Sequence, residues 1–94
     1  MYNLNNPSFV LFYANWCGHC QTFMPTWEKF KTKINKKKYN IVEIESQNPF
    51  TNRIKGLQGY PSLYYIQNDK VIEYNEGRDL KSLKEFFKKN KKLN

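Results

Sequence analysis

The chain contains three separate segments whose apolar residues are patterned as β-structure. Phe9 to Ala14 is a continuous apolar run, which predicts a central strand buried on both faces. Tyr39 to Glu45 predicts a second strand. The turn at Asn68-Asp69 joins two further short runs and predicts an antiparallel hairpin of Ser62–Ile66 with Lys70–Tyr74.

Apolar residues at a spacing of three to four predict the helices. The first is expected from Cys17 to about Asn35, and a short second one from Phe50 to Leu57. Asp79 can cap a last helix, whose apolar face comprises Leu80, Leu83, Phe86 and Phe87. The order strand, helix, strand, helix, strand, strand, helix predicts an α/β fold with a mixed four-stranded sheet flanked by helices.

The length of 94 residues indicates one domain spanning residues 1–94. Met1 to Pro7 is polar and rich in asparagine, and we expect it to form a flexible arm. The longest apolar run is too short to cross a bilayer, and no charged-then-apolar leader precedes it. We therefore expect no membrane association and an intracellular or viral protein by default, or a secretory one if a leader has been removed.

The formal net charge of +8 comes from fourteen lysines and only two arginines, Arg53 and Arg78. Abundant Lys, Asn, Ile, Tyr and Phe are what an A+T-rich genome encodes, so part of this charge reflects codon bias. Nucleic-acid-binding proteins more often gather arginine and aromatic residues on one surface. We therefore favour a solvated basic surface, and nucleic-acid binding is the last of our hypotheses.

The segment Cys17-Gly18-His19-Cys20 carries the strongest chemical signal in the chain. Two cysteines and one histidine cannot complete a four-ligand zinc site, so no metal or other cofactor is expected. Two residues between cysteines in the first turn of a helix bring the sulfurs close enough to bond. A Cys17–Cys20 disulfide can therefore open and close without moving the fold.

The predicted helix start gives the two cysteines different roles. Cys17 lies where unpaired backbone N–H groups and the positive end of the helix dipole stabilise a thiolate, so it is the expected nucleophile. Cys20, one turn further in, is expected to be more often protonated and to resolve the mixed disulfide. Two alternatives remain open: a buried cysteine pair without catalytic importance, and half of an intermolecular metal site.

The stretch Phe12-Tyr13-Ala14-Asn15-Trp16-Cys17-Gly18-His19-Cys20 resembles the active-site segment of the thioredoxin superfamily, closest to the catalytic domains of protein disulfide isomerase. Gly59-Tyr60-Pro61-Ser62 resembles the family's cis-proline segment, and Tyr74 through Gly77-Arg78 resembles the isomerase pattern before the last helix. The resemblance spans nearly the whole chain from Phe9 onward.

The resemblance implies roles for several residues. Pro61 is expected to be cis and, with Tyr60 and the exposed ring of Trp16, to contact bound substrate. Arg78 is expected to swing towards Cys20 and ease its deprotonation. The family's thioredoxins carry proline where this chain has His19, whose ring can stabilise the Cys17 thiolate and make the disulfide more oxidising.

Two features depart from the family pattern. A buried acid usually lies six residues before the first cysteine, where this chain has Leu11, so deprotonation of Cys20 should be slower unless Arg78, water, Glu43 or Glu45 compensates. Only eight residues precede Phe9, so we expect a minimal thioredoxin-like fold without the usual N-terminal strand and helix. The size resembles a glutaredoxin, but the active-site sequence does not favour glutathione chemistry.

The sequence therefore predicts a monomeric thiol–disulfide oxidoreductase that acts on protein thiols and disulfides, with isomerase-like poise and an unknown recycling partner. The alternative is a weakly active or redox-inert module that holds extended peptides near Trp16, Tyr60 and Pro61.

Overall fold

We analysed a computed structural model, which describes residues 6–53, 57, 59–68 and 70–91. The described elements follow the predicted order, with one change of helix type. In chain order they are β1 (Ser8–Tyr13), α1 (Gly18–Lys31), β2 (Asn40–Glu45), the 3-10 helix η1 (Pro49–Arg53), β3 (Ser62–Gln67), β4 (Lys70–Glu73) and α2 (Leu80–Lys91).

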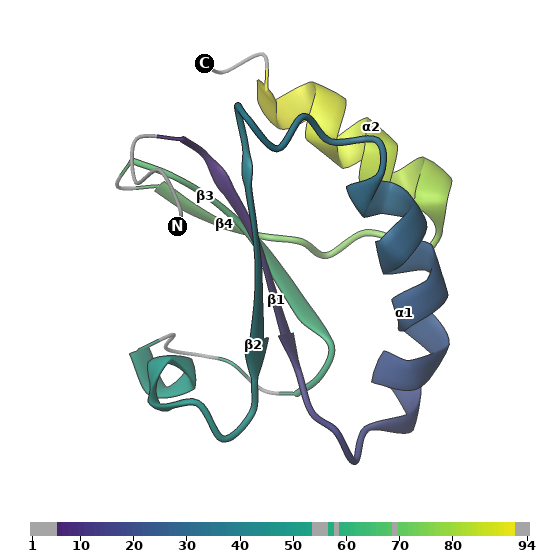
Figure 1. Cartoon of the computed structure of the whole chain (residues 1–94), viewed down its shortest axis with the longest axis vertical. Coiled ribbons are helices and arrows are strands. Elements are labelled where there is room, and N and C mark those ends of the chain that lie inside the picture. Colours follow the sequence, from purple (N-terminus) through teal and green to yellow (C-terminus); the bar gives the residue numbers. More distant parts are fainter. Residues whose placement is uncertain (1–5, 54–56, 58, 69, 92–94) are drawn as a thin grey trace.

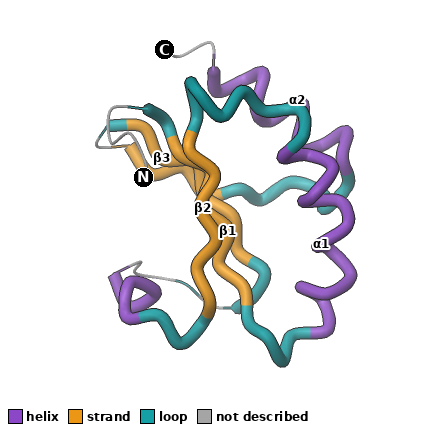
Figure 2. Tube along the Cα trace, in the orientation of Figure 1, coloured by secondary structure: helices purple, strands orange, loops and turns teal. Residues whose placement is uncertain are grey.

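The four strands form one mixed sheet in the order β2-β1-β3-β4. β1 pairs in parallel with β2 and antiparallel with β3, while β3 and β4 form the predicted hairpin. The continuous apolar run of β1 therefore occupies an interior position, as its pattern predicts (Figure 1). Figure 2 shows the loops that connect the strands at both ends of the sheet.

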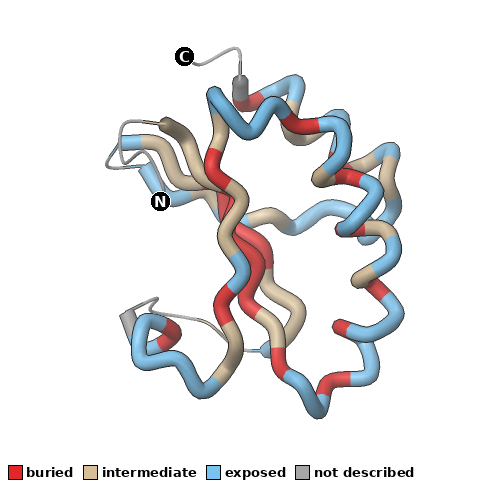
Figure 3. Tube along the Cα trace, in the orientation of Figure 1, coloured by how far each residue is buried: buried red, intermediate tan, exposed pale blue. Residues whose placement is uncertain are grey.

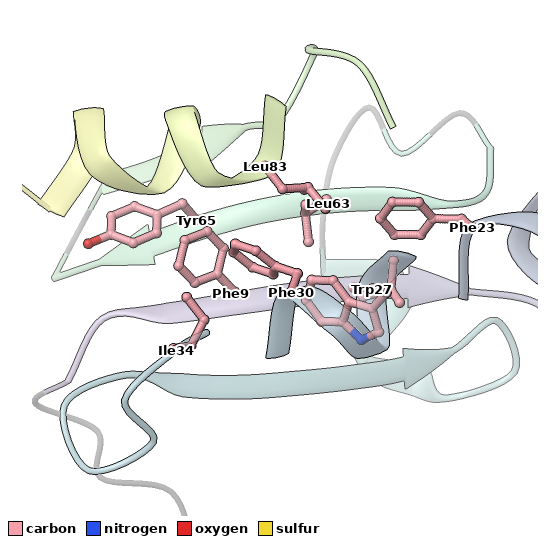
Figure 4. Close-up of a cluster of buried hydrophobic side chains, with 9 residues drawn as sticks. Phe9, Phe23, Trp27, Phe30, Ile34, Leu63, Tyr65 and Leu83 are labelled. Carbon is pink, nitrogen blue, oxygen red and sulfur yellow. The ribbon is translucent and has the colours of Figure 1, made fainter. Parts of the chain in front are cut away.

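Both α-helices lie on the same face of the sheet and cover its main core (Figure 1). Successive strand residues point to opposite faces, so Phe9 and Leu11 of β1 point towards the helices. Phe9 is fully buried, and its ring makes edge contacts with Phe30 and Tyr65 at centroid distances of 5.3 and 4.9 Å. The buried members of this core are Phe9, Leu11, Phe23, Trp27, Phe30, Ile34, Leu63, Tyr65 and Leu83 (Figure 4).

The opposite face carries a smaller apolar cluster. Val10 and Phe12 of β1 contribute to it together with Ile44 and Tyr64. The central residues of β1 are all buried (Figure 3). They belong alternately to the core under the helices and to the cluster on the opposite face. On this side of the sheet the described helix is η1 alone, which lies over one end (Figures 1 and 2).

The helix boundaries differ from the expected ones in two places. α1 ends at Lys31 rather than near Asn35, because the backbone N–H groups of Lys33 and Ile34 donate to carbonyls three residues earlier and tighten the chain into a turn. The short helix expected from Phe50 to Leu57 is instead a 3-10 helix of five residues. The Asn48 side chain accepts from the N–H of Phe50 and tightens the start of this 3-10 helix. Residues 54–56 of the expected helix lie outside the described part.

The last two residues of the expected arm contact the body of the domain. The Asn6 side chain donates to the carbonyl of Lys37, and the Asn40 backbone N–H donates to the carbonyl of Pro7 at 2.8 Å. Residues 1–5 lie outside the described part. Neither helix described here has the length and apolar character that crossing a bilayer requires.

Candidate functional site: a pair of cysteines at a helix start

Cys17 occupies the N-cap position of α1. Its backbone is extended (φ −90°, ψ 113°), and its N–H donates to the carbonyl of Ala14 at 3.1 Å. Cys20 follows three residues later, on the buried side of the first helical turn. The predicted placement of the cysteines, between a buried strand and a helix, is therefore what the fold produces.

The Cys17 sulfur takes the place of the usual capping oxygen. The Cys20 backbone N–H donates to Cys17 Sγ at 3.1 Å, and the Cys17 thiol lies 3.5 Å from the carbonyl oxygen of Tyr60, to which it can donate. An N-cap side chain normally accepts from the N–H two or three positions into the helix. The helix start thus supplies a hydrogen bond that a negatively charged sulfur strengthens.

The surroundings of Cys17 favour its thiolate. Burial alone raises the pKa of a thiol, but hydrogen bonds from Cys20 and from the backbone N–H of His19, together with the charge of Arg78, hold the Cys17 pKa below its usual value. Both cysteines are buried free thiols. A lowered pKa makes Cys17 the better nucleophile of the two at neutral pH.

The pKa of Cys20 shifts in the opposite direction. Burial, the hydrogen bond with Cys17 and the negative charge of Cys17 raise the pKa of Cys20 to about 11, although Arg78 opposes the increase. The two thiols are close enough that the protonation of one affects the other, and the site stabilises a single negative charge. The pKa directions place that charge on Cys17 and keep the proton on Cys20.

The loop before β3 brings a second segment to the cysteines. The Tyr60–Pro61 peptide bond is cis, as the resemblance implied. Tyr60 packs against the small buried cluster of Ala14, Cys17 and Cys20, and its ring makes an edge contact with Trp16 at 5.9 Å. Trp16 is 73% exposed, so an apolar aromatic surface lies beside the reactive sulfur.

Arg78 approaches the cysteines from the segment before α2. Its side chain is exposed, and its charge lowers the pKa of both thiols. With Leu11 and Pro61 it also lines a cavity of about 270 Å³. Tyr74 anchors the segment by donating its hydroxyl to the carbonyl of Gly77. Arg78 therefore acts on the two thiols through its charge.

Leu11 is fully buried, and the two glutamates considered as replacements for a buried acid have other partners. Glu43 accepts from Trp27 Nε1 at 2.6 Å and from Lys31 Nζ at 2.7 Å. Glu45 accepts from the backbone N–H of Asn15 at 3.1 Å. Glu45 therefore ties the end of β2 to the loop that carries Cys17, a positioning contact that the sequence did not reveal.

His19 and Gly18, the two residues between the cysteines, are exposed. His19 lowers the Cys17 pKa through a hydrogen bond from its backbone N–H. A Cβ atom at Gly18 would meet no atom within 4 Å, so crowding at that position does not explain the glycine. In the part of the chain that the structure describes, cysteine, histidine and acidic side chains form no group of three or more that could hold a metal ion.

Comparison with known proteins agrees with this architecture. The sequence model of the thioredoxin family matches residues 2–89. The thioredoxin domain-containing protein 5 homolog of Drosophila melanogaster is 33% identical over 88 residues, a match that covers 87% of this chain and 21% of that protein. Protein disulfide-isomerase erp38 of Neurospora crassa is 33% identical over 87 residues, covering 86% of this chain and 23% of that protein. The chain thus spans about a fifth of the length of these relatives.

Solved structures give the same result. The Trx4 domain of ERdj5 superimposes with a TM-score of 0.80 at 28% identity, covering 96% of this chain and 83% of that one. The J-Trx1 fragment of ERdj5 has a TM-score of 0.81 at 29% identity, covering 94% of this chain and 44% of that one. The family match and the cysteine pair together support thiol–disulfide oxidoreductase chemistry in general. The chain belongs to the thioredoxin family.

Proposed function

We propose that residues 1–94 act as one thioredoxin-type domain that exchanges electrons with protein cysteines. The observation that carries this proposal is the position of the two thiols: Cys17 caps the start of α1, and its Sγ accepts the Cys20 N–H at 3.1 Å. This arrangement agrees with a lowered pKa of Cys17 and a pKa of Cys20 raised to about 11. Thiol–disulfide exchange by a cysteine pair needs one thiol that attacks the substrate and a second thiol that stays protonated until it resolves the mixed disulfide. The relatives named protein disulfide-isomerase support an activity of this class.

The first step uses the Cys17 thiolate. It attacks one sulfur of a substrate disulfide, a new S–S bond forms between Cys17 and the substrate, and the second substrate sulfur leaves as a thiolate that takes a proton from water. The Cys20 N–H and the positive end of α1 stabilise the attacking thiolate before the step. No metal or organic cofactor takes part in this scheme.

The second step uses Cys20. Once Cys17 is bonded to substrate, it no longer carries the charge that helps to hold the Cys20 proton. Cys20 then gives its proton to water and attacks the Cys17 sulfur. The mixed disulfide breaks, and the substrate sulfur that was bonded to Cys17 leaves as a thiolate and takes a proton from water. The substrate has gained two electrons and two protons, and the domain holds a Cys17–Cys20 disulfide. Run in reverse, the same steps oxidise a substrate dithiol.

We infer an isomerase-like, relatively oxidising poise from the stabilisation of the reduced form. Anything that favours the Cys17 thiolate favours the dithiol and makes the disulfide a stronger oxidant. The His19 backbone N–H belongs to this set, and its exposed ring lies between the two cysteines in the sequence, where we propose that it stabilises the thiolate further.

Substrates are proposed to bind as extended protein segments beside Trp16, Tyr60 and Pro61. The exposed Trp16 ring offers apolar contact area, and Tyr60 holds it in an edge arrangement. A dithiol or disulfide partner must restore the starting redox state after each cycle. We propose that the domain works as a monomer.

The proposal is tested by comparing the wild-type chain with Cys17→Ser in insulin reduction and in oxidative refolding of a reduced protein. Both activities should disappear in Cys17→Ser, because the attacking thiolate is gone and Cys20 alone cannot form the Cys17–Cys20 disulfide that completes the cycle. Full activity of Cys17→Ser would contradict the proposal.

A peptide-binding module without redox activity is the second candidate, favoured by the 73% exposure of Trp16. It predicts that wild type and Cys17→Ser are both inactive in these assays yet bind an unfolded protein equally well, and that Trp16→Ser weakens this binding.

A further inference from the structure

The turn that leads into Cys17 lies beside the last residue of a neighbouring strand. β1 and β2 run parallel, so the loops that follow them leave the same end of the sheet (Figure 1). Tyr13, the last residue of β1, pairs with Glu45, the last residue of β2. The Glu45 side chain therefore starts next to the segment 14–16, which joins β1 to Cys17.

The two ends of this turn are held differently from its tip. Ala14 is 1% exposed and Cys17 is 6% exposed, and the Cys17 N–H donates to the Ala14 carbonyl at 3.1 Å. Asn15 is exposed at the tip. Its N–H donates to Glu45 Oε2 at 3.1 Å, and its carbonyl accepts from the Gln21 side chain at 3.5 Å. Packing thus fixes the ends of the turn, whereas hydrogen bonds fix its tip.

Both oxygens of the Glu45 carboxylate accept hydrogen bonds. Oε2 accepts from the Asn15 N–H at 3.1 Å and from the Ser46 hydroxyl at 2.9 Å, and Oε1 accepts from the Gln47 N–H at 2.7 Å. These bonds, of which that from Gln47 contributes most, hold the pKa of Glu45 below its usual value. An amide has one acceptor oxygen with two lone pairs, so only a carboxylate can accept from all three donors.

The backbone of Glu45 is held as well as its side chain. The Glu45 carbonyl accepts from the Asn48 N–H at 2.9 Å and from the Thr51 hydroxyl at 3.2 Å. Thr51 belongs to η1 and is buried. A side chain on a strand end that is fixed in this way can hold a neighbouring loop, because rigid elements position a site more precisely than loops do.

We propose that Glu45 is a positioning residue, which fixes the turn at Asn15 and thereby sets the position of the Cys17 sulfur at the start of α1. This inference rests on the proposed function, in which Cys17 is the nucleophile. The carboxylate holds the turn, so it acts on Cys17 through two residues of backbone. The Cys17 sulfur accepts from the Cys20 N–H only while Cys17 keeps its N-cap position.

A purely electrostatic role of Glu45 has the opposite consequence. A negative charge near a thiol raises the pKa of that thiol, so loss of the Glu45 charge alone would lower the Cys17 pKa. Loss of positioning weakens the hydrogen bonds from the Cys20 and His19 N–H groups and therefore raises the Cys17 pKa. The sign of the shift separates the two roles.

The test uses the full 94-residue chain in its reduced form. Glu45→Gln removes the charge and one acceptor oxygen, whereas Glu45→Asp keeps the charge on a side chain shorter by one methylene. Ser46→Ala is the matched control, because it removes the other donor to Oε2 and leaves the bond from Asn15. Glu28→Gln controls for the loss of an exposed negative charge. Iodoacetamide labelling across pH gives the midpoint of Cys17, and NMR hydrogen exchange gives the protection of the Asn15 N–H.

The Asn15 N–H should exchange about tenfold faster in Glu45→Gln and Glu45→Asp, in the range of a hydrogen bond to a charged group. In both variants the Cys17 midpoint should rise by about half a unit, which slows labelling about threefold on the acid side of the profile. Ser46→Ala and Glu28→Gln should keep the wild-type values. An unchanged amide signal of Phe9 shows that the core is folded, and Glu45→Asp carries the test if Glu45→Gln disturbs the core.

Four results would overturn the proposal. A lower midpoint in Glu45→Gln with a wild-type midpoint in Glu45→Asp would show a charge effect. Unchanged exchange at Asn15 would show that Glu45 does not hold the turn, and faster exchange with an unchanged midpoint would show that the turn does not position Cys17. Equal changes in Ser46→Ala would show that the contact with Asn15 is not the cause. Labelling requires no protein substrate, so a wild-type chain that fails to reduce insulin would contradict the proposed function but not the role of Glu45.

Discussion

The Cys20 backbone N–H donates to the Cys17 sulfur at 3.1 Å, so the residue proposed to resolve the mixed disulfide also stabilises the thiolate of the proposed nucleophile. The negative charge of the Cys17 thiolate also helps to hold the proton on Cys20, because it raises the Cys20 pKa. When Cys17 becomes part of a mixed disulfide, this restraint on Cys20 disappears. The order of attack and resolution is therefore built into one helical turn.

Alkylation of Cys17 should follow a pKa below the usual thiol value of about 8.5. Because the Cys17 pKa is lowered, the thiolate is lost only as the pH falls through that lower value, and the rate reaches a plateau above it. Iodoacetamide labelling of the reduced chain across pH, read by mass spectrometry, measures the midpoint. In denaturant the midpoint should return to the usual value, and a folded midpoint at or above the denatured one contradicts the assignment.

Two substitutions at His19 separate the contribution of its ring to the reduction potential from that of its backbone N–H. His19→Ala keeps the N–H that lowers the Cys17 pKa, whereas His19→Pro removes both the ring and the N–H. We expect the reduction potential to fall in His19→Ala and to fall further in His19→Pro, by about 30 mV for each tenfold change in the equilibrium. Titration against glutathione buffers measures both variants, and an unchanged potential in His19→Pro would refute the role given to this position.

Arg78→Gln should raise the pKa of both Cys17 and Cys20, because the charge of Arg78 lowers both. The shift should be smaller than about one unit, since an exposed charge is screened by water and salt. The same alkylation profile measures it. Arg78→Lys should retain most of the effect, and Lys81→Gln, a loss of charge elsewhere on the surface, should leave the profile unchanged. An equal shift in Lys81→Gln would show a general charge effect instead.

Placing an acid at Leu11 should accelerate resolution and weaken the fold. A carboxylate there gives the Cys20 proton an acceptor, but Leu11 is fully buried, so Leu11→Glu should lower the free energy of unfolding by about 2–4 kcal/mol. Leu11→Gln is the matched control, with a similar loss of stability and no acceptor. Single-turnover release of a mixed disulfide at neutral pH measures the rate. Equal rates in the two variants contradict the need for an acid.

Phe9→Ala should lower the free energy of unfolding by about 3–5 kcal/mol, because the ring is fully buried among aromatic side chains. Phe50→Ser should lower it by less, about 1–2 kcal/mol, since Phe50 is 40% exposed. Urea unfolding of the reduced chain measures both. A large loss in Phe50→Ser would mean that η1 belongs to the core.

The sequence predicted the strands well because each has a strong local pattern. The apolar run from Phe9 to Ala14 marks β1, and the turn residues after Gln67 mark the hairpin. It placed the end of the first helix too late and did not distinguish the 3-10 helix from an α-helix, since the tight turns after Lys31 and the side-chain contact of Asn48 are local hydrogen bonds that periodicity does not register.

The cysteine pair was predicted from its spacing and from its place between a predicted strand and a predicted helix, whereas its neighbours were not. Tyr60 and Arg78 lie 43 and 61 residues along the chain from Cys17, and only the family resemblance connected them to it. The contact of Glu45 with Asn15 spans 30 residues and was missed, because no sequence pattern reports which strand end meets which loop.

The most direct test of the central claim is to trap the mixed disulfide in Cys20→Ala. This variant keeps the Cys17 thiolate but removes the group that resolves it, so incubation with a disulfide-containing protein should accumulate a covalent complex. Mass spectrometry of the linked peptides should locate the bond at Cys17, and Cys17→Ala treated in the same way should accumulate little complex. Equal or greater trapping through Cys20 in Cys17→Ala would contradict the assignment of Cys17 as the nucleophile.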